Sequence, residues 1–204
     1  DGARYANLSK EAKDSLKQGL LHDQGYLCAY CMSRIDEKHT GMRVEHFRCQ
    51  SKYPNLQLNY DNLLGCCHGG SLTKKTHHCD ASKGNTDITC SPLDPACIAS
   101  LSYSSEGRIH SNNSEWNTEL DRILNLNTSK LIQNRQEALE SLMTELKVEL
   151  PPHLTLEERR SVLTNFRKRI KTPDSDGKLN PYCGILIYWL ERMLRELEGE
   201  HTAG

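Results

Sequence analysis

The fold is decided by residues 28–85, which carry four short motifs: Cys28-Ala29-Tyr30-Cys31, Val44-Glu45-His46-Phe47, Asn62-Leu63-Leu64-Gly65-Cys66-Cys67-His68-Gly69 and Cys79-Asp80-Ala81-Ser82-Lys83-Gly84-Asn85. Cysteines alternate here with an acid–histidine pair, an asparagine and a lysine. Each motif alone is common among proteins. The occurrence of all four motifs in this order is much more specific, and the functional interpretation below rests on it.

The Cys28–Cys31 pair has the spacing of half a zinc site or of a thioredoxin-like redox pair. A redox pair opens a helix after a buried strand, whereas this pair follows a predicted helix and a turn at Gly25. Cys79 and one of the adjacent Cys66 and Cys67 can supply two further thiolates. Four thiolates favour a closed, structural zinc site, and the residues alone leave open which of the adjacent pair binds.

The composition is that of a soluble globular protein, with 36% hydrophobic and 26% charged residues. No apolar run approaches the roughly 20 residues of a membrane span, and no secretion signal is visible, so we expect a cytoplasmic protein. Because the chain begins at Asp1 rather than Met, we expect a natural N-terminal segment to be missing. The formal net charge of −1 argues against nucleic-acid binding by bulk charge alone.

Cysteine is unusually frequent, and its distribution is uneven. Eight of the nine cysteines lie between Cys28 and Cys97. An odd number in a chain without a secretion signal fits metal ligands better than a disulfide framework. A second metal site made by Cys49, Cys90 and Cys97 is a weaker alternative.

Hydrophobic periodicity predicts an α+β chain, with short strands in the cysteine-rich stretch and helices on both sides. The predicted elements are a helix over 8–23, strands over 43–47 and 62–67, and several helices after residue 115. One of these starts at a capping box at Thr155–Glu158, and the last starts near Pro181. The prolines, serines and asparagines of residues 86–114 predict an irregular connector or a peripheral loop layer rather than a core. The sequence therefore predicts three regions: an N-terminal helical segment (1–27), a cysteine-rich domain with its loop extension (28–114) and a C-terminal helical region (115–204).

With these motifs the chain resembles the HNH endonuclease family in its zinc-bearing form. That family's pattern runs from CxxC through an acid–His pair on a strand and an Asn-Leu leading into a cysteine. It closes with a cysteine, a polar metal ligand and a lysine at the start of a helix. The resemblance implies a ββα-metal (HNH) core within residues 28–114. It also implies a structural Zn²⁺ bound by Cys28, Cys31, Cys67 and Cys79, because the family's Asn-to-Cys spacing favours Cys67 over Cys66.

The resemblance further implies phosphodiester hydrolysis by five residues: His46, Asn62, Glu45, Asp80 and Lys83. We expect His46 to be the general base, since an imidazole pKa of about 6.5 allows proton uptake near neutral pH, and Asn62 to orient its ring. Glu45 and Asp80 are hard oxygen ligands that suit a catalytic Mg²⁺ or Mn²⁺. Lys83, one helical turn after Asp80, is expected to contact a flanking phosphate.

Several basic residues are candidates for the nucleic-acid path, although each alone is more often a solvated charge: Arg43, Arg48, Lys52, Lys74 and Lys75. His77 and His78 are either further zinc or phosphate contacts or solvated loop residues. The sequence does not distinguish DNA from transfer RNA as the substrate. Two alternatives to a defence nuclease are a non-catalytic zinc module that scaffolds a partner ATPase and a housekeeping HNH nuclease.

A narrower resemblance extends beyond the core, through LCAYCMSRI (27–35), ILNLNTSKLIQNRQEAL (123–139) and PYCGILIYWLERML (181–194). These segments resemble the PtuB-type HNH subunits of Septu antiphage systems, which also occur beside retrons. The resemblance implies a hetero-oligomer with an ABC-type ATPase (PtuA) and, in retron-linked versions, with a reverse transcriptase and its msDNA. This chain has no Walker motif of its own. Its C-terminal Tyr188, Trp189 and Met193 either dock on such an ATPase or form the tail's own core.

Overall fold

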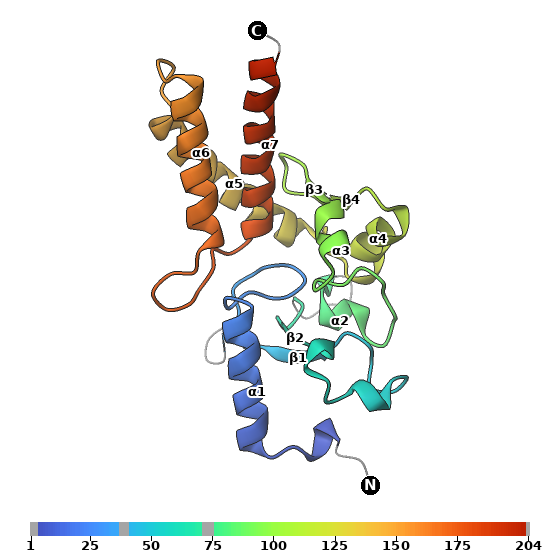
Figure 1. The fold of residues 1–204 in the computed structure, drawn as a ribbon. Helices are drawn as coiled ribbons and strands as arrows, with labels where there is room; N and C mark the ends of the chain where they lie inside the picture. Colours follow the sequence, from blue (N-terminus) through green and yellow to red (C-terminus); the bar gives the residue numbers. More distant parts are fainter. Residues whose placement is uncertain (1–3, 37–40, 71–75, 203–204) are drawn as a thin grey trace.

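The computed structural model describes residues 4–36, 41–70 and 76–202, with the backbone alone for residues 200–202. The chain is α+β, as predicted from its periodicity. Figure 1 shows α1, β1, β2 and α2 at one end of the molecule and α6 and α7 at the other, with α5 running between them. One hydrophobic core includes residues from α1 through α7.

The first helix, α1, spans Lys10–Asp23 and leads directly into the first cysteine pair. It starts two residues later than predicted because the Ser9 side chain accepts a hydrogen bond from Ala12 N and so caps the helix. Leu20 and Leu21 are buried. A turn through Gly25 and Tyr26, both with positive φ, then reverses the chain toward Cys28.

The two predicted strands form an antiparallel pair. β1 spans Arg43–His46 and β2 spans Leu63–Cys66, with Glu45 opposite Leu64 and His46 opposite Leu63. Both strands are slightly shorter than predicted. The short helix α2, Asp80–Lys83, begins directly after Cys79. β1 and α2 carry Glu45, His46, Asp80 and Lys83, and three more candidate site residues directly flank these elements: Asn62, Cys67 and Cys79.

The prediction of an irregular peripheral layer over residues 86–114 is wrong. This stretch contains α3 (Pro95–Ser100) and a hairpin of β3 (Leu101–Tyr103) and β4 (Ile109–Ser111). Ile88, Tyr103 and Ile109 are buried in the core. The weaker alternative of a second metal site is also wrong, because Cys90 and Cys97 form a disulfide with each other.

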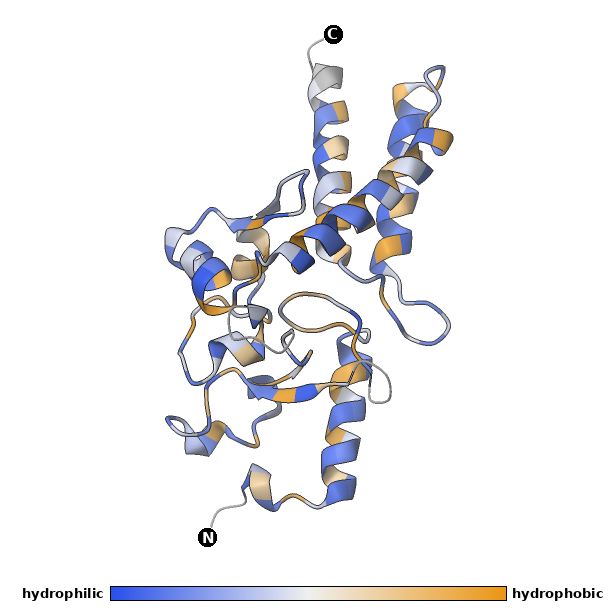
Figure 2. Cartoon of the chain, turned by 180° about the vertical axis from the view of Figure 1, so that it is seen from behind, coloured by the Kyte–Doolittle hydropathy of each residue, from blue (hydrophilic) through white to orange (hydrophobic). Residues whose placement is uncertain are grey.

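The C-terminal half is helical, as predicted. It comprises α4 (Ser114–Thr118), a π-helical turn (Glu119–Ile123), α5 (Ser129–Glu149), α6 (Leu156–Lys171) and α7 (Cys183–Thr202). The predicted capping box at the start of α6 is confirmed: Thr155 and Glu158 each bond the other's backbone N–H. Figure 2 shows apolar residues recurring among hydrophilic ones along α6 and α7, the pattern of helices with one buried face.

The apolar residues of the last helix form the tail's own core. Ile185, Leu186, Leu190 and Leu194 are buried, and Trp189 packs partly buried against the same cluster. Tyr188, Trp189 and Met193 are only partly buried, so their docking on a partner stays a prediction. Within the described ranges, none of the helices combines the length and the apolar composition that a membrane span requires.

Candidate metal and catalytic site

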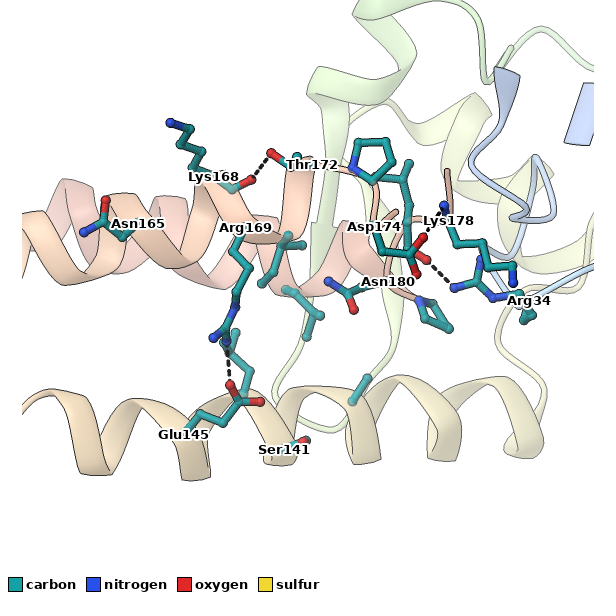
Figure 3. Close-up of a pocket in the computed structure, with 17 residues that line it drawn as sticks. Arg34, Ser141, Glu145, Asn165, Lys168, Arg169, Thr172, Asp174, Lys178 and Asn180 are labelled. Atoms are coloured by element: carbon teal, nitrogen blue, oxygen red, sulfur yellow. Dashed lines mark hydrogen bonds and ion pairs between the residues drawn. The ribbon is translucent and has the colours of Figure 1, made fainter. Parts of the chain in front are cut away.

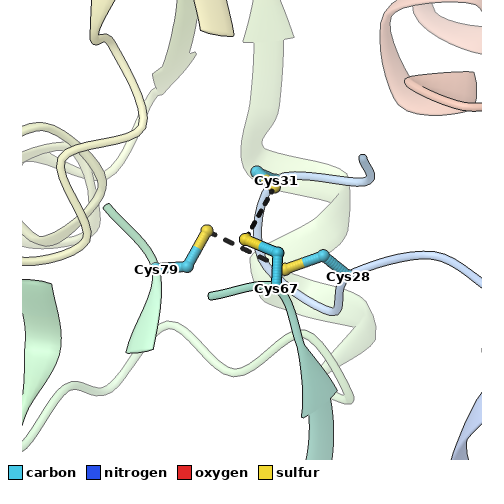
Figure 4. Close-up of side chains that lie close together, drawn as sticks. All are labelled: Cys28, Cys31, Cys67 and Cys79. Carbon is cyan, nitrogen blue, oxygen red and sulfur yellow. Dashed lines mark hydrogen bonds between the residues drawn. The ribbon is translucent and has the colours of Figure 1, made fainter. Parts of the chain in front are cut away.

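Four cysteines from three separate parts of the chain meet in one cluster (Figure 4): Cys28, Cys31, Cys67 and Cys79. The Sγ atoms of Cys28 and Cys79 are 3.8 Å apart, as are those of Cys31 and Cys67. All four Sγ atoms lie within 4.8 Å of one another. Zinc–sulfur bonds of about 2.3 Å give a tetrahedron with edges of about 3.8 Å. The cluster therefore fits a zinc ion with four thiolate ligands.

Backbone hydrogen bonds set the positions of these thiols. The Cys28–Cys31 turn is closed by a bond from Met32 N to Cys28 O, and Ala29 N donates to Gly65 O on β2. Cys79 has a positive φ of 56°, and its N–H donates to Leu124 O. This contact ties the cluster to the helical half of the chain.

The adjacent Cys66 and Cys67 have different surroundings: Cys66 is the last residue of β2, and Cys67 follows the strand. The Cys67 thiol joins the cluster, whereas Cys66 is fully buried and is not one of the four grouped donors. His78 lies beside the cluster, with Nδ1 3.1 Å from Cys79 Sγ. The His78 imidazole is therefore placed to hydrogen-bond the Cys79 thiol, and it is not one of the four grouped donors.

A cleft of about 360 Å³ opens next to this cluster, where β1 ends and α2 begins. It is lined by Val44, Glu45, His46, Cys49, Gln50, Ser51, Asp80, Gly84 and Asn85. Three of the five candidate catalytic residues thus face one cavity. Lys83 and Asn62 are not among the lining residues.

The His46 imidazole is held by two glutamines. Its Nε2 lies 3.1 Å from the Gln57 carbonyl oxygen, and its Nδ1 lies 3.1 Å from the Gln50 side-chain nitrogen. A carbonyl can only accept, so Nε2 carries the proton and Nδ1 accepts from Gln50. Burial lowers the pKa of His46 below its usual value. The ring is therefore neutral near pH 7, with a basic nitrogen directed toward the cleft residue Gln50.

Asn62 acts on the backbone rather than on the imidazole, contrary to the sequence-based expectation. Its Oδ1 accepts from Arg48 N at 2.7 Å, and its Nδ2 donates to the carbonyls of Arg48 and Leu56, each at 3.1 Å. Asn62 thus ties the loop that follows β1 to the start of β2. Because Leu56 precedes Gln57, whose carbonyl binds His46, the effect on the ring is indirect.

The Glu45 carboxylate is buried, with a side chain only 7% exposed, and pairs with Lys83 Nζ at 2.7 Å. Burial raises the pKa of Glu45 to about 8, and the nearby Asp80 carboxyl adds to the rise. Two carboxyl groups within hydrogen-bonding reach of one another repel when both are charged. A divalent cation between them would relieve this repulsion.

Lys83 does not reach the surface, so the expected phosphate contact is wrong. Its side chain is 0% exposed. Removing one partner of a buried ion pair typically lowers the free energy of unfolding by about 3–5 kcal/mol. Lys83 is therefore an internal partner of Glu45 rather than a ligand of the substrate.

The basic residues proposed for the nucleic-acid path make different contacts, and none of those that the structure describes lines the cleft. Arg43 NH1 lies 3.8 Å from Asp80 Oδ2, and Lys52 pairs with Asp87 at 2.9 Å. The Arg48 guanidinium stacks on Phe47 and on Tyr53. Lys74 and Lys75, the other two candidates for the nucleic-acid path, lie outside the described residues.

Two known proteins are similar to part of this chain. One is the Septu protein PtuB of Bacillus thuringiensis, 42% identical over 65 residues, which is 32% of this chain and 25% of that protein. The other is the Retron Ec83 putative HNH endonuclease of Escherichia coli, 44% identical over 63 residues, which is 28% of this chain and 24% of that protein. About a third of this chain is thus similar to a Septu protein and to a putative HNH endonuclease of a retron.

The similarity is local, since the match spans about a quarter of the length of these curated relatives. No family model matches the chain.

Sequence reasoning missed three residues of the site. Tyr30, inside the first cysteine pair, donates a hydrogen bond to Glu45. Gln50 and the Gln57 carbonyl hold His46. The position of Tyr30 between Cys28 and Cys31 was a usable clue. The glutamines gave none, because one acts through its backbone and the other lies on a loop.

A second cavity, of about 770 Å³, has no lining residue in common with this cleft. Figure 3 shows it between α5, α6 and the loop that joins α6 to α7. Two of its charged groups make contacts within the lining: Arg169 pairs with Glu145, and Arg34 donates to the Leu179 carbonyl. None of the candidate site residues is among those that line this cavity.

Proposed function

We propose that the chain is a metal-dependent HNH endonuclease that hydrolyses nucleic-acid phosphodiester bonds as the effector of an antiphage defence complex. The observation that carries the proposal is the gathering of Glu45, His46 and Asp80 around one cleft, beside a cluster of four cysteines. In this proposal β1, β2 and α2 form the ββα-metal core, and residues 28–114 form the nuclease domain. The similarity to a retron HNH endonuclease supports the reaction class.

The proposed metal set has two parts. Zn²⁺ bound by Cys28, Cys31, Cys67 and Cys79 holds the core together. Glu45 and Asp80 bind a catalytic Mg²⁺ or Mn²⁺, an ion that typically takes one or two carboxylates and completes its shell with water and phosphate oxygens. When bound, that ion stabilises the charge that develops on the scissile phosphate.

The chain's own residues supply the base and its support. His46 Nδ1 accepts the proton of the attacking water once the substrate displaces the Gln50 amide. The Gln57 carbonyl keeps the proton on Nε2, which preserves the basic tautomer. Asn62 keeps the loop bearing that carbonyl in register with β2.

The proposed setting is a cytoplasmic hetero-oligomer. By analogy with its Septu and retron relatives, an ABC-type ATPase such as PtuA controls the nuclease, and a reverse transcriptase with msDNA joins in retron-linked systems. The helical segment 1–27 and the helical region 115–204 flank the nuclease domain. The latter region provides a surface for partners. The relatives' names support a defence role.

The substrate class is tested by cleavage assays on the full chain with its co-purified ATPase, against duplex DNA and total transfer RNA. Asp80→Asn is the test variant, and Asp61→Asn is the matched control, because Asp61 is an exposed acid in the 3-10 turn Tyr60–Asn62 that precedes β2. We expect cleavage of one substrate class by the wild type and by Asp61→Asn, and a loss of at least about tenfold in Asp80→Asn. Equal cleavage by Asp80→Asn would reject the metal role of Asp80.

A non-catalytic zinc module is the second candidate function. One observation favours it: both ring nitrogens of His46 already have hydrogen-bond partners. A folded, zinc-loaded and activated complex that cleaves neither substrate would support this candidate instead.

A further inference from the structure

A buried ammonium group lies behind the cleft. Lys83 Nζ is 2.7 Å from Glu45 Oε1 and donates to the His46 backbone oxygen at 3.4 Å. Both acceptors belong to the last two residues of β1, while Lys83 is the last residue of α2. The ammonium group therefore joins the strand that carries the acid and the base to the helix that begins with Asp80.

A second donor reaches the same carboxylate oxygen. The Tyr30 hydroxyl donates to Glu45 Oε1 at 3.4 Å, and the Tyr30 ring is only 7% exposed. Tyr30 lies between Cys28 and Cys31, two members of the thiol cluster. The orientation of Glu45 thus depends on the part of the chain that the four thiols organise.

Two donors on Oε1 leave Oε2 as the oxygen available to the cleft that Glu45 lines. We infer that Lys83 and Tyr30 are positioning residues that hold Glu45 Oε1 and so direct Oε2 toward a divalent cation shared with Asp80. This inference rests on the proposed function, and it gives the zinc cluster a role in binding the second metal.

The role of Lys83 can be tested by whether its removal weakens or tightens the binding of a divalent cation. If Lys83 were only a nearby positive charge, its removal would tighten the binding of a divalent cation, because like charges repel. If it positions Glu45, its removal weakens that binding. A purely structural lysine would change stability without a specific change in cation affinity.

The experiment is a Mn²⁺ titration of the zinc-loaded full chain, followed by the electron paramagnetic resonance signal of free Mn²⁺. In Lys83→Met we expect Mn²⁺ affinity to fall about tenfold or more, the scale of a lost charge-assisted hydrogen bond. In Tyr30→Phe we expect a fall of about two- to fivefold, the scale of a lost neutral hydrogen bond. Zinc content is expected to stay at one per chain in both.

Lys171→Met is the matched control, because Lys171 pairs with Glu191 at 2.9 Å on the helical tail and is half exposed. We expect wild-type Mn²⁺ affinity in this variant. Unchanged or tighter Mn²⁺ binding in Lys83→Met overturns the inference. If that variant does not fold, wild-type affinity in a zinc-loaded Tyr30→Phe overturns it. Absence of Mn²⁺ binding by the wild type would instead contradict the proposed function.

Discussion

Replacement of His46 by alanine is expected to lower the rate of nucleic-acid cleavage by about 10²–10⁴-fold, the usual contribution of a general base. His46 is 6% exposed and lines the cleft with Glu45 and Asp80. No other imidazole is among the residues that line this cavity. Single-turnover rates with saturating metal would measure the chemical step.

The matched control is His22→Ala, because the His22 side chain is 79% exposed on α1 and is remote from the cleft lining. Wild-type rates are expected in that variant. Retention of more than about a tenth of wild-type activity by folded His46→Ala would assign the proton transfer to another group.

The largest expected effect on stability is that of Cys67→Ser. Structural zinc sites contribute about 10–16 kcal/mol of apparent binding free energy, which is also folding free energy. Cys67 Sγ lies 3.8 Å from Cys31 Sγ in the cluster. We expect the variant to lose zinc and the fold of its β1–β2–α2 region, as measured by zinc content per chain and by thermal unfolding.

The neighbouring Cys66→Ser is the control, since Cys66 is buried beside the cluster but is outside the four grouped thiols. It is expected to keep one zinc per chain, with only the modest loss of stability that a hydroxyl in an apolar site brings. Zinc loss in Cys66→Ser together with zinc retention in Cys67→Ser would exchange the roles of the two cysteines.

Metal-ligand spacing predicted only the four-thiolate site, with Cys66 and Cys67 as alternatives, and the resemblance to the HNH family implied the rest of the site. The cysteine pair at 28–31 and the later Cys67 and Cys79 do meet. Glu45, His46 and Asp80 share a cleft because one strand ends, and one helix begins, beside that cluster. Strand and helix periodicities were sufficient to place these elements to within about two residues.

The predictions failed where tertiary contacts determine the direction and the partners of a side chain. One helical turn separates Asp80 from Lys83, yet the sequence does not say that the lysine points into the protein toward Glu45. Asn62 was predicted to bind an imidazole, but three backbone groups satisfy its amide. Residues 86–114 have a loop-like composition, and a disulfide and a short hairpin nevertheless give them buried side chains.

The central claim is that a divalent cation held near Glu45 and Asp80 enables this cleft to cut nucleic acid. The most direct test is cleavage by the full complex after weakly bound metal has been removed with EDTA, with zinc content verified, as Mg²⁺ or Mn²⁺ is added back. We predict no cleavage in EDTA and saturable recovery with either ion at constant zinc. Undiminished cleavage without added metal, or none at any concentration by the folded, activated complex, would contradict the account.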